Sequence, residues 1–398
     1  MAKRIVWTGI ILLLLLIGTN TYALSLNETA LKILKDGPGW ESQEKSLESV
    51  FHNLNVTTNL PDPEVGGEYL IAPVSEDNRW AAELTWGLEW PGVYNARIQE
   101  AKKKFSSAER AVYAERVEKL AGIKDLLLDY ILCKQKLKLL EELNQNNDSI
   151  YRLSEQAARG GEMTVLDLNK VRLEYANIRV TKAALLDEEA GIEGELSQIY
   201  GKDCTPLLED MDMEFPEIVI PSEEVITSIG AGAPGVQLAN AEVEAARQMQ
   251  KVAKMESLPS LSVGYKHAYE EGTHFNGALI GISLPFLSSK GKKKAAKAEI
   301  IEAEFKAEVA QLEVETDASQ AFRKLVLINR QIAEIEPILK NSDHNTLLLK
   351  AYSGGVITLL DYLSERNYFT TAEMEMVALR HAAAKTQARL QKYLEAGF

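Results

Sequence analysis

The sequence predicts a mainly helical fold with a small β part, built from two copies of one pattern. Pro91 and Pro285 end short alternating segments, and Gly160 and Gly354 each follow 69 positions later, so both landmarks recur at an offset of 194. The stretches between proline and glycine are nearly free of helix-breaking residues, which is typical of long helices. Repeats of this size indicate a duplicated structural unit.

The N-terminus has the composition of an export signal. Two basic residues precede an apolar run that is too short for a comfortable transmembrane helix, and Ala23 ends a plausible cleavage site. We therefore expect residues 1–23 to be removed on export, with an uncleaved anchor as the alternative. No cysteine lies near this site, so no lipid anchor is expected. Cys133 and Cys204 could pair in an oxidising compartment, but the sequence does not decide it.

The remaining chain divides into two structural repeats. We assign residues 24–202 to the first repeat and 222–398 to the second, with a proline-containing acidic linker at 203–221. Each repeat is predicted to begin with a shorter helix and to continue through two strands into a long helix. A returning helix ends each repeat.

Four segments alternate between apolar and polar residues, which is typical of half-buried strands. The predicted strands are about 64–72, 80–91, 260–269 and 276–286. Trp80, Trp86 and Trp90 lie on one face of the second of them. Polar or glycine-containing turns separate the strands of each repeat, so each pair is predicted to form a β-hairpin.

After each hairpin the sequence predicts a helix longer than an ordinary globular domain contains. No proline occurs between Gly92 and Ala158, and apolar residues recur there at spacings of three, four and seven. At ~1.5 Å rise per residue, a helix of about 65 residues would be roughly 100 Å long. This spacing favours helices packed side by side as coiled coils. Pro337 interrupts the second tract, where we expect a kink or a break.

Glycine pairs are predicted to end the long helices, because glycine tolerates the left-handed conformation of a C-cap. A threonine then starts the returning helix. The residues of the two tips are Gly160, Gly161 and Thr164 in the first repeat and Gly354, Gly355 and Thr358 in the second. Each repeat should therefore contain a helical hairpin with a tight turn.

Composition and motifs exclude several function classes. A net charge of −14 makes nucleic acid a poor partner. The basic cluster of Lys290, Lys292, Lys293, Lys294 and Lys297 either meets anionic lipid headgroups or is a solvated face. The five histidines have no metal-ligand spacing, and no nucleophile elbow, phosphate loop or dinucleotide fingerprint occurs. We therefore expect no catalytic residues, no cofactor and no metal site.

Four amphipathic strands cannot close into a barrel. An open sheet edge in lipid leaves backbone groups unsatisfied at a cost of several kcal/mol each, and the smallest bacterial barrels use about eight strands. Several chains must therefore contribute to one barrel, and three chains would supply twelve strands. Trp80, Trp86 and Trp90 are then expected at the membrane interface.

These patterns resemble the TolC family of bacterial outer-membrane efflux proteins, and within it the CzcC-like branch of heavy-metal efflux. The most specific elements are Pro285 followed by Lys290-Gly-Lys-Lys-Lys-Ala, the two tip sequences and the 194-residue offset. The resemblance implies a homotrimer in which four strands per chain form a twelve-stranded outer-membrane β-barrel, continued by a long periplasmic α-helical coiled-coil barrel. It also implies a passive exit duct for small molecules or metal cations, which an inner-membrane RND or ABC transporter delivers through a periplasmic adaptor protein.

The resemblance further implies roles for single residues. The glycines and threonines of both tips would contact the adaptor. Asp361 matches a tip aspartate that narrows the periplasmic entrance, and Asp167 is its counterpart in the first repeat. Each aspartate is also typical of the first turn of a helix. Two other functions remain open, the outer-membrane duct of a type I protein secretion system and an exported coiled-coil scaffold protein.

Overall fold

The computed structural model describes residues 24–71, 78–145, 147–161, 163–285, 288–340 and 344–394. The predicted signal peptide therefore lies outside the described residues. The chain forms two compact units. The tip unit comprises Met1–Gly37, Leu126–Pro216 and His344–Val377, and the sheet unit comprises Pro38–Asp125, Glu217–Asp343 and Ala378–Phe398. Each unit combines segments from both halves of the sequence.

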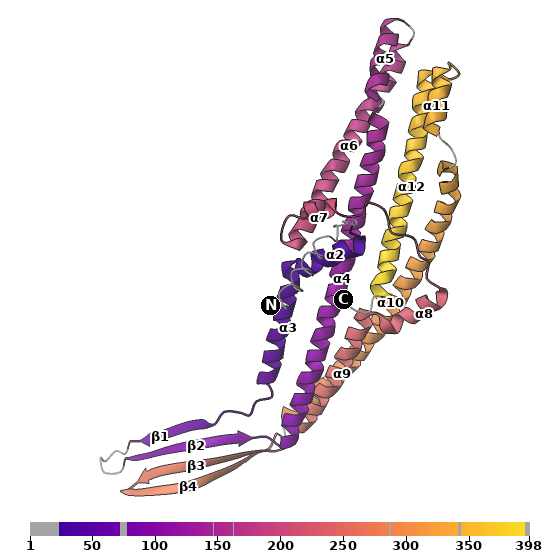
Figure 1. The fold of residues 1–398 in the computed structure, drawn as a ribbon. Coiled ribbons are helices and arrows are strands. Elements are labelled where there is room, and N and C mark those ends of the chain that lie inside the picture. The colour runs from indigo at the N-terminus through magenta and orange to yellow at the C-terminus, as the bar shows by residue number, and fades with distance from the viewer. Residues whose placement is uncertain are drawn as a thin grey trace, which may run out of the picture. The chain divides into compact units, whose positions relative to one another are not determined.

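Figure 1 labels the elements of both units. The tip unit contains α2 (Leu26–Asp36), the end of α4 (Pro91–Gln145), α5 (Asn147–Arg159), α6 (Val165–Tyr200), α7 (Thr205–Glu209), α11 (His344–Ser353) and the start of α12 (Leu359–Leu394). The sheet unit contains α3 (Pro38–Val56), β1 (Glu64–Leu70), β2 (Arg79–Leu88), the start of α4, α8 (Glu223–Gly232), α9 (Pro234–Met255), β3 (Ser260–Glu270), β4 (Thr273–Ser283), α10 (Ser288–Lys340) and the end of α12.

The helix that was predicted to open each repeat is in fact two helices. In the first repeat, α2 ends before Pro38, and Pro38 starts α3. In the second repeat, α8 ends before Pro234, and Pro234 starts α9. Gly37 has ψ of 149° and Ala233 has ψ of 138°, so both are extended. The prediction of one helix was wrong because the residue before proline is disfavoured in the helical region.

The long helices follow the hairpins, as predicted. In the first half, α4 is described to Gln145 and α5 from Asn147. In the second half, α10 continues through Pro337 and ends at Lys340. The helix α10 is therefore not broken at Pro337. Among the described residues, no helix combines the length and the apolar character needed to cross a membrane.

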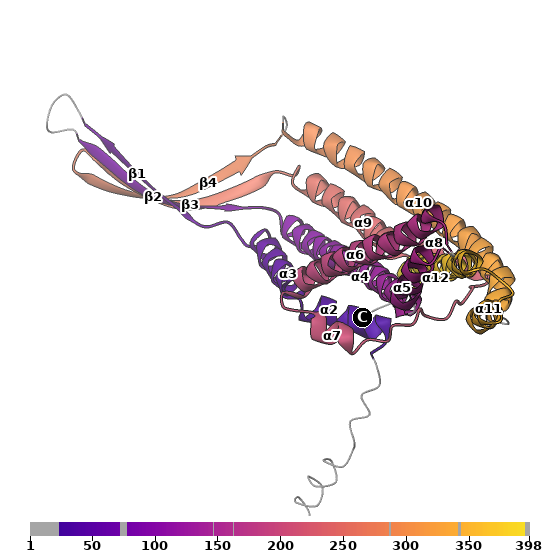
Figure 2. The ribbon, with the colours of Figure 1, turned by 90° about the horizontal axis from the view of Figure 1, so that it is seen from above.

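The four strands form one antiparallel sheet in the order β1-β2-β3-β4, and Figure 2 shows them side by side. Both predicted hairpins are present, and β2 pairs with β3 to join them. The register pairs Trp80 with Tyr269 and Leu84 with Tyr265. Since directly paired residues point to the same side of a sheet, this register places the apolar positions of all four strands on one face.

Separate apolar cores hold the helices of each unit. In the tip unit, Leu127 and Ile131 of α4 and Leu196 of α6 are fully buried. In the sheet unit, Ala303 of α10 packs with Val243 and Ala246 of α9. These residues recur at helical spacings, so the amphipathic pattern of the long helices is used for packing within each unit.

Candidate functional site

The second predicted tip, between α11 and α12, is a tight glycine turn in the tip unit. Gly354 N–H donates to Lys350 O at 2.9 Å and Gly355 N–H donates to Tyr352 O at 3.0 Å. Gly355 has φ of +69°, a left-handed conformation that glycine adopts without steric cost. A Cβ on Gly354 would lie 3.1 Å from Lys350 O. Both positions therefore favour glycine.

The first predicted tip, between α5 and α6, has the same construction. Gly160 N–H donates to Gln156 O at 2.9 Å. Gly161 has φ of +78°, and a Cβ there would meet nothing within 4 Å. The need for glycine at position 161 is thus conformational, because the space around it is open.

A threonine and an aspartate cap the helix that follows each turn. Thr164 Oγ1 accepts from Asp167 N–H at 3.1 Å, and Thr358 Oγ1 accepts from Asp361 N–H at 3.2 Å. Each threonine hydroxyl donates in return to the aspartate carboxylate at 2.7 Å. In the second tip the Thr358 backbone N–H also donates to Asp361 Oδ2 at 3.1 Å, which completes a capping box with aspartate as the acid. The threonine caps fix where α6 and α12 begin.

The same hydrogen bonds set the charge of the two aspartates. The Thr358 hydroxyl, followed by the Thr358 backbone N–H, lowers the pKa of Asp361, and the Thr164 hydroxyl lowers the pKa of Asp167. Both carboxyls are therefore ionised at neutral pH. Their stabilising effect is complete above the ordinary carboxyl pKa and is lost as the pH falls through the lowered values.

The two tips differ in how the first turn of the following helix packs. In the tip unit, Leu359 and Leu360 pack against a buried cluster that includes Tyr362. The residues 194 positions earlier are Val165 and Leu166, and they are 73% and 68% exposed. The first tip therefore presents apolar surface at a position where the second tip is packed.

The three predicted interface tryptophans lie at or near the ends of β2 in the sheet unit. Trp80 stacks with Tyr269 at 6.3 Å between ring centroids, beside the turn that joins β3 to β4. Trp86 Nε1 donates to Pro61 O at 2.7 Å. Trp90 follows the strand at its other end and is 54% exposed. Aromatic side chains thus occur at both ends of the sheet.

An ion-pair cluster where the sheet meets the helices was not predicted from the sequence. Arg97 of α4 contacts Glu89 Oε2 at 2.6 Å through Nη1 and Glu256 Oε1 at 2.8 Å through Nη2. Lys292, one of the basic cluster, contacts Glu256 Oε2 at 3.3 Å. Burial raises the pKa of Glu256, but the hydrogen bonds from Arg97 and Lys292 outweigh it and lower the pKa. No local sequence signal links Arg97 to Glu256, because 159 positions separate them in the chain.

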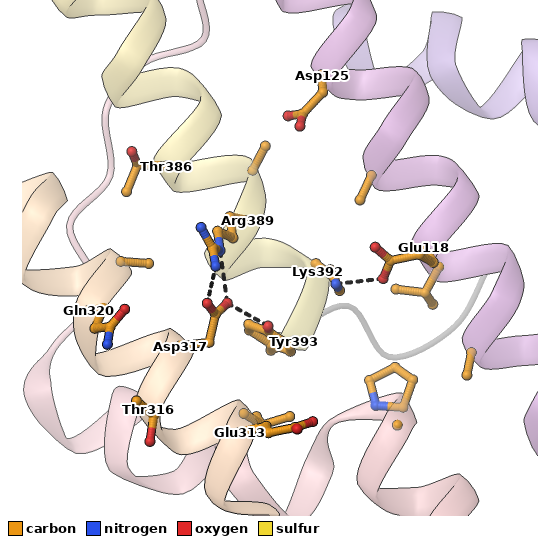
Figure 3. Close-up of a pocket in the computed structure, with 18 of the residues that line it drawn as sticks. Glu118, Asp125, Glu313, Thr316, Asp317, Gln320, Thr386, Arg389, Lys392 and Tyr393 are labelled. Atoms are coloured by element: carbon orange, nitrogen blue, oxygen red, sulfur yellow. Dashed lines mark hydrogen bonds and ion pairs between the residues drawn. The ribbon is translucent and has the colours of Figure 1, made fainter. Parts of the chain in front are cut away.

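The sheet unit also contains a cavity of about 1150 Å³ lined by α4, α10 and the end of α12 (Figure 3). Arg389 Nε donates to Asp317 Oδ2 at 2.8 Å, and the Tyr393 hydroxyl donates to the same oxygen at 2.6 Å. Lys392 Nζ pairs with Glu118 Oε2 at 2.5 Å. Asp317 and Glu118 are thus each paired with a cationic side chain of α12, an arrangement that stabilises helix packing.

Both cysteines are free and buried. Burial, together with the charge of Glu188, raises the pKa of the Cys133 thiol to about 12. A thiol of this kind is unreactive at neutral pH, since the thiolate is the reactive form. Within the described part of the chain, no group of three or more histidine, cysteine, aspartate or glutamate side chains is placed to hold a metal ion.

Comparison with known sequences finds similarity to a metal-resistance protein. No family model matches the chain. The cobalt-zinc-cadmium resistance protein CzcC of Cupriavidus metallidurans is 20% identical over 246 residues, which cover 61% of this chain and 57% of the relative. The similarity therefore spans a little more than half of the length of that protein.

Comparison with solved structures gives matches over nearly the whole chain. A membrane protein from Pseudomonas aeruginosa has a TM-score of 0.78 at 15% identity and covers 94% of this chain and 90% of its own. The CmeC outer membrane channel of Campylobacter jejuni has a TM-score of 0.76 at 16% identity and covers 92% of this chain and 85% of its own. The structure of CusC has a TM-score of 0.67 at 15% identity and covers 96% of this chain and 94% of its own. At these identities the matches establish the fold.

The CmeC structure is that of an outer membrane channel, the kind of protein that the sequence resemblance indicated. The family resemblance stated from the sequence is confirmed. The chain has the fold of the TolC family of outer-membrane efflux channels, and in sequence it is similar to the CzcC branch.

Proposed function

We propose that this protein is the outer-membrane exit duct of a tripartite efflux system and that it works as a homotrimer. The observation that carries the proposal is the open four-stranded sheet, whose apolar face is solvent-exposed in the single chain. Val65, Ile280 and Ile282 on this face are 82%, 77% and 66% exposed. Exposed apolar surface of this extent has to be covered by lipid or by another protein.

The edges of the sheet support a barrel made from several chains. Within the described residues, β1 and β4 each pair with one strand, so each has a free edge. Free edges in lipid are costly, and closure with further strands removes them. Three copies of this sheet would give twelve strands, an even number within the range of bacterial outer-membrane barrels.

The aromatic residues fit the thickness of a membrane. Trp80 and Trp90 are ten residues apart, which is roughly 33 Å along an extended chain. A tilt of about 40° reduces this to roughly 25 Å across the membrane, the height of the apolar band of an outer-membrane barrel. Trp80 and Trp90 would then mark the two interfaces, with Trp86 near the inner one.

The helix tips are proposed to meet a periplasmic adaptor protein. The glycines of the tips have no side chain beyond a hydrogen atom, and Thr164 and Thr358 cap the helices that follow. Small residues at a tight turn let another helical hairpin approach the backbone closely. An inner-membrane RND or ABC transporter would supply the driving force, and the duct would pass small molecules or metal cations. The similarity to a cobalt-zinc-cadmium resistance protein favours metal cations.

The trimer can be tested by crosslinking at the sheet edges. Cysteines replacing Val65 in β1 and Ile280 in β4 should form disulfides between neighbouring chains, because these edge strands would pair in the barrel. Denaturing gels of outer membranes should then show a ladder that ends at three chains. Each single-cysteine variant is the matched control and should give no ladder. Isolation of a stable monomeric barrel would contradict the proposal.

Asp361 is proposed to form a ring of carboxylates at the periplasmic entrance, with Asp167 adding to it. In a trimer the three copies would lie near the axis and would attract cations. Asp361→Ala should therefore reduce cation selectivity and block by divalent cations in planar bilayers and raise the conductance. Thr358→Ala is the control, because it weakens the same helix cap and keeps the carboxylate. Equal effects of the two substitutions would mean that Asp361 serves only as a helix cap.

A further inference from the structure

Two histidines meet on the apolar face of the sheet, at the end where β3 turns into β4. His267 Nε2 and His274 Nδ1 are 3.2 Å apart, with 22° between the ring planes. His274 is exposed and His267 is partly exposed. The contact depends on strand register, because His267 pairs with Asn276 and His274 pairs with Tyr269 on the neighbouring strand.

Neighbouring side chains fix the tautomer of His267. Its Nδ1 is 2.8 Å from Asn276 Oδ1, and the Tyr265 hydroxyl also donates to that oxygen. An amide oxygen can only accept, so His267 Nδ1 carries the hydrogen and Nε2 has a free lone pair. This lone pair is placed to accept a hydrogen bond from Nδ1–H of His274.

We propose that His267 and His274 form a binding site for one divalent transition-metal ion such as Zn²⁺. Neutral imidazole is a preferred ligand of zinc, copper and nickel. Metal-bound histidines generally donate their other ring N–H to an oxygen acceptor, and Asn276 already accepts from His267 in this way. The site lies within one hairpin and does not depend on which substrate the duct carries.

The distances suit an ion held by both rings. With Zn–N bonds of about 2.0–2.1 Å, two nitrogens on a tetrahedral ion lie roughly 3.4 Å apart. The observed separation of 3.2 Å is close to this value. The ion takes the place of the hydrogen between the rings, and His274 turns so that the two lone pairs converge. His274 changes tautomer, its hydrogen moving from Nδ1 to Nε2, so no net proton is released. Water completes the coordination.

The aromatic surroundings give the site a spectroscopic signal. The Trp80 ring lies 5.3 Å from the His267 ring and 6.5 Å from the His274 ring. Tyr269 lies 5.0 Å from His274. A bound Cu²⁺ ion should therefore quench the fluorescence of Trp80.

The test uses the full-length protein in detergent, purified without a histidine tag. Calorimetric titration with ZnCl₂ should give one ion per chain in the unchanged protein. Loss of either ligand, in His267→Ala or His274→Ala, should weaken binding roughly 10-fold or more. His52→Ala is the matched control, because His52 is an exposed histidine on α3 and its loss should leave the affinity unchanged. Equal zinc affinity in the unchanged protein and in the doubly substituted protein would overturn the proposal.

A second measurement avoids any folding defect of the variants. Electron paramagnetic resonance of the unchanged protein with one equivalent of Cu²⁺ should show hyperfine coupling to two imidazole nitrogens, together with quenched tryptophan fluorescence. Coupling to no imidazole or to a single imidazole would also overturn the proposal. Neither readout requires efflux activity, so failure of the metal site is distinguishable from failure of the duct.

Discussion

Leu84→Arg should remove most of the protein from the outer membrane. Leu84 lies midway along β2 on the apolar face and is 48% exposed. An arginine at this depth on the lipid face of a barrel costs about 2–4 kcal/mol. Each 1.4 kcal/mol is a factor of about ten, so the amount of inserted protein should fall roughly 30-fold or more. The measurement is quantitative immunoblotting of separated outer membranes.

Thr85→Arg provides the control at the same depth. Thr85 is the next residue of β2, points to the opposite face and pairs with Glu64 of β1. An arginine there would face the water-filled interior of the proposed barrel and a carboxylate, so insertion should stay within about twofold of the unchanged protein. Equal outer-membrane levels of the two variants would mean that the apolar face does not contact lipid.

The double substitution Gly161→Arg and Gly355→Arg should abolish efflux while the trimer still assembles. Both positions have open space around a Cβ, so the arginines would project from the tips. Bulky charged groups there would prevent close approach of an adaptor hairpin. The left-handed conformation adds roughly 1–2 kcal/mol of strain at each site. Resistance to the exported compound should fall to the level of a strain that lacks the protein, while crosslinking still gives trimers.

Gly201→Arg is the control that distinguishes backbone strain from loss of adaptor docking at the tips. Gly201 has φ of +77° and ends α6 at the opposite end from the tip, so it carries comparable strain away from the proposed contact. Efflux should persist in this variant. If the tip variant also retained full resistance at a normal outer-membrane level, docking at the glycine tips would be ruled out.

Much of the fold follows from local sequence patterns. Period-two alternation located the strands to within a few residues, because each side of a half-buried strand has its own chemical environment. The left-handed glycines Gly161 and Gly355 located the helix ends, because few other residues adopt that conformation. The threonine and aspartate after each turn cap the next helix through contacts between residues three positions apart, so the sequence alone predicts these caps.

Other features of the site were decided by tertiary structure. Nothing in the local pattern of Leu359 or Val165 indicates that the first packs against a core while the second is exposed, because that difference comes from neighbouring helices. The ion pair of Arg97 with Glu256 and the pairing of β2 with β3 join residues that lie more than a hundred positions apart.

The same holds for the histidines. Five of them with no recognisable spacing predicted no metal site. The register of β3 against β4 nevertheless brings His267 and His274 to 3.2 Å, across a hairpin turn. The sequence by itself determined the repeated elements and their ends, since these depend on periodicity and backbone conformation. Only the folded chain decided which side chains meet, because strand register and helix packing join residues that no local pattern connects.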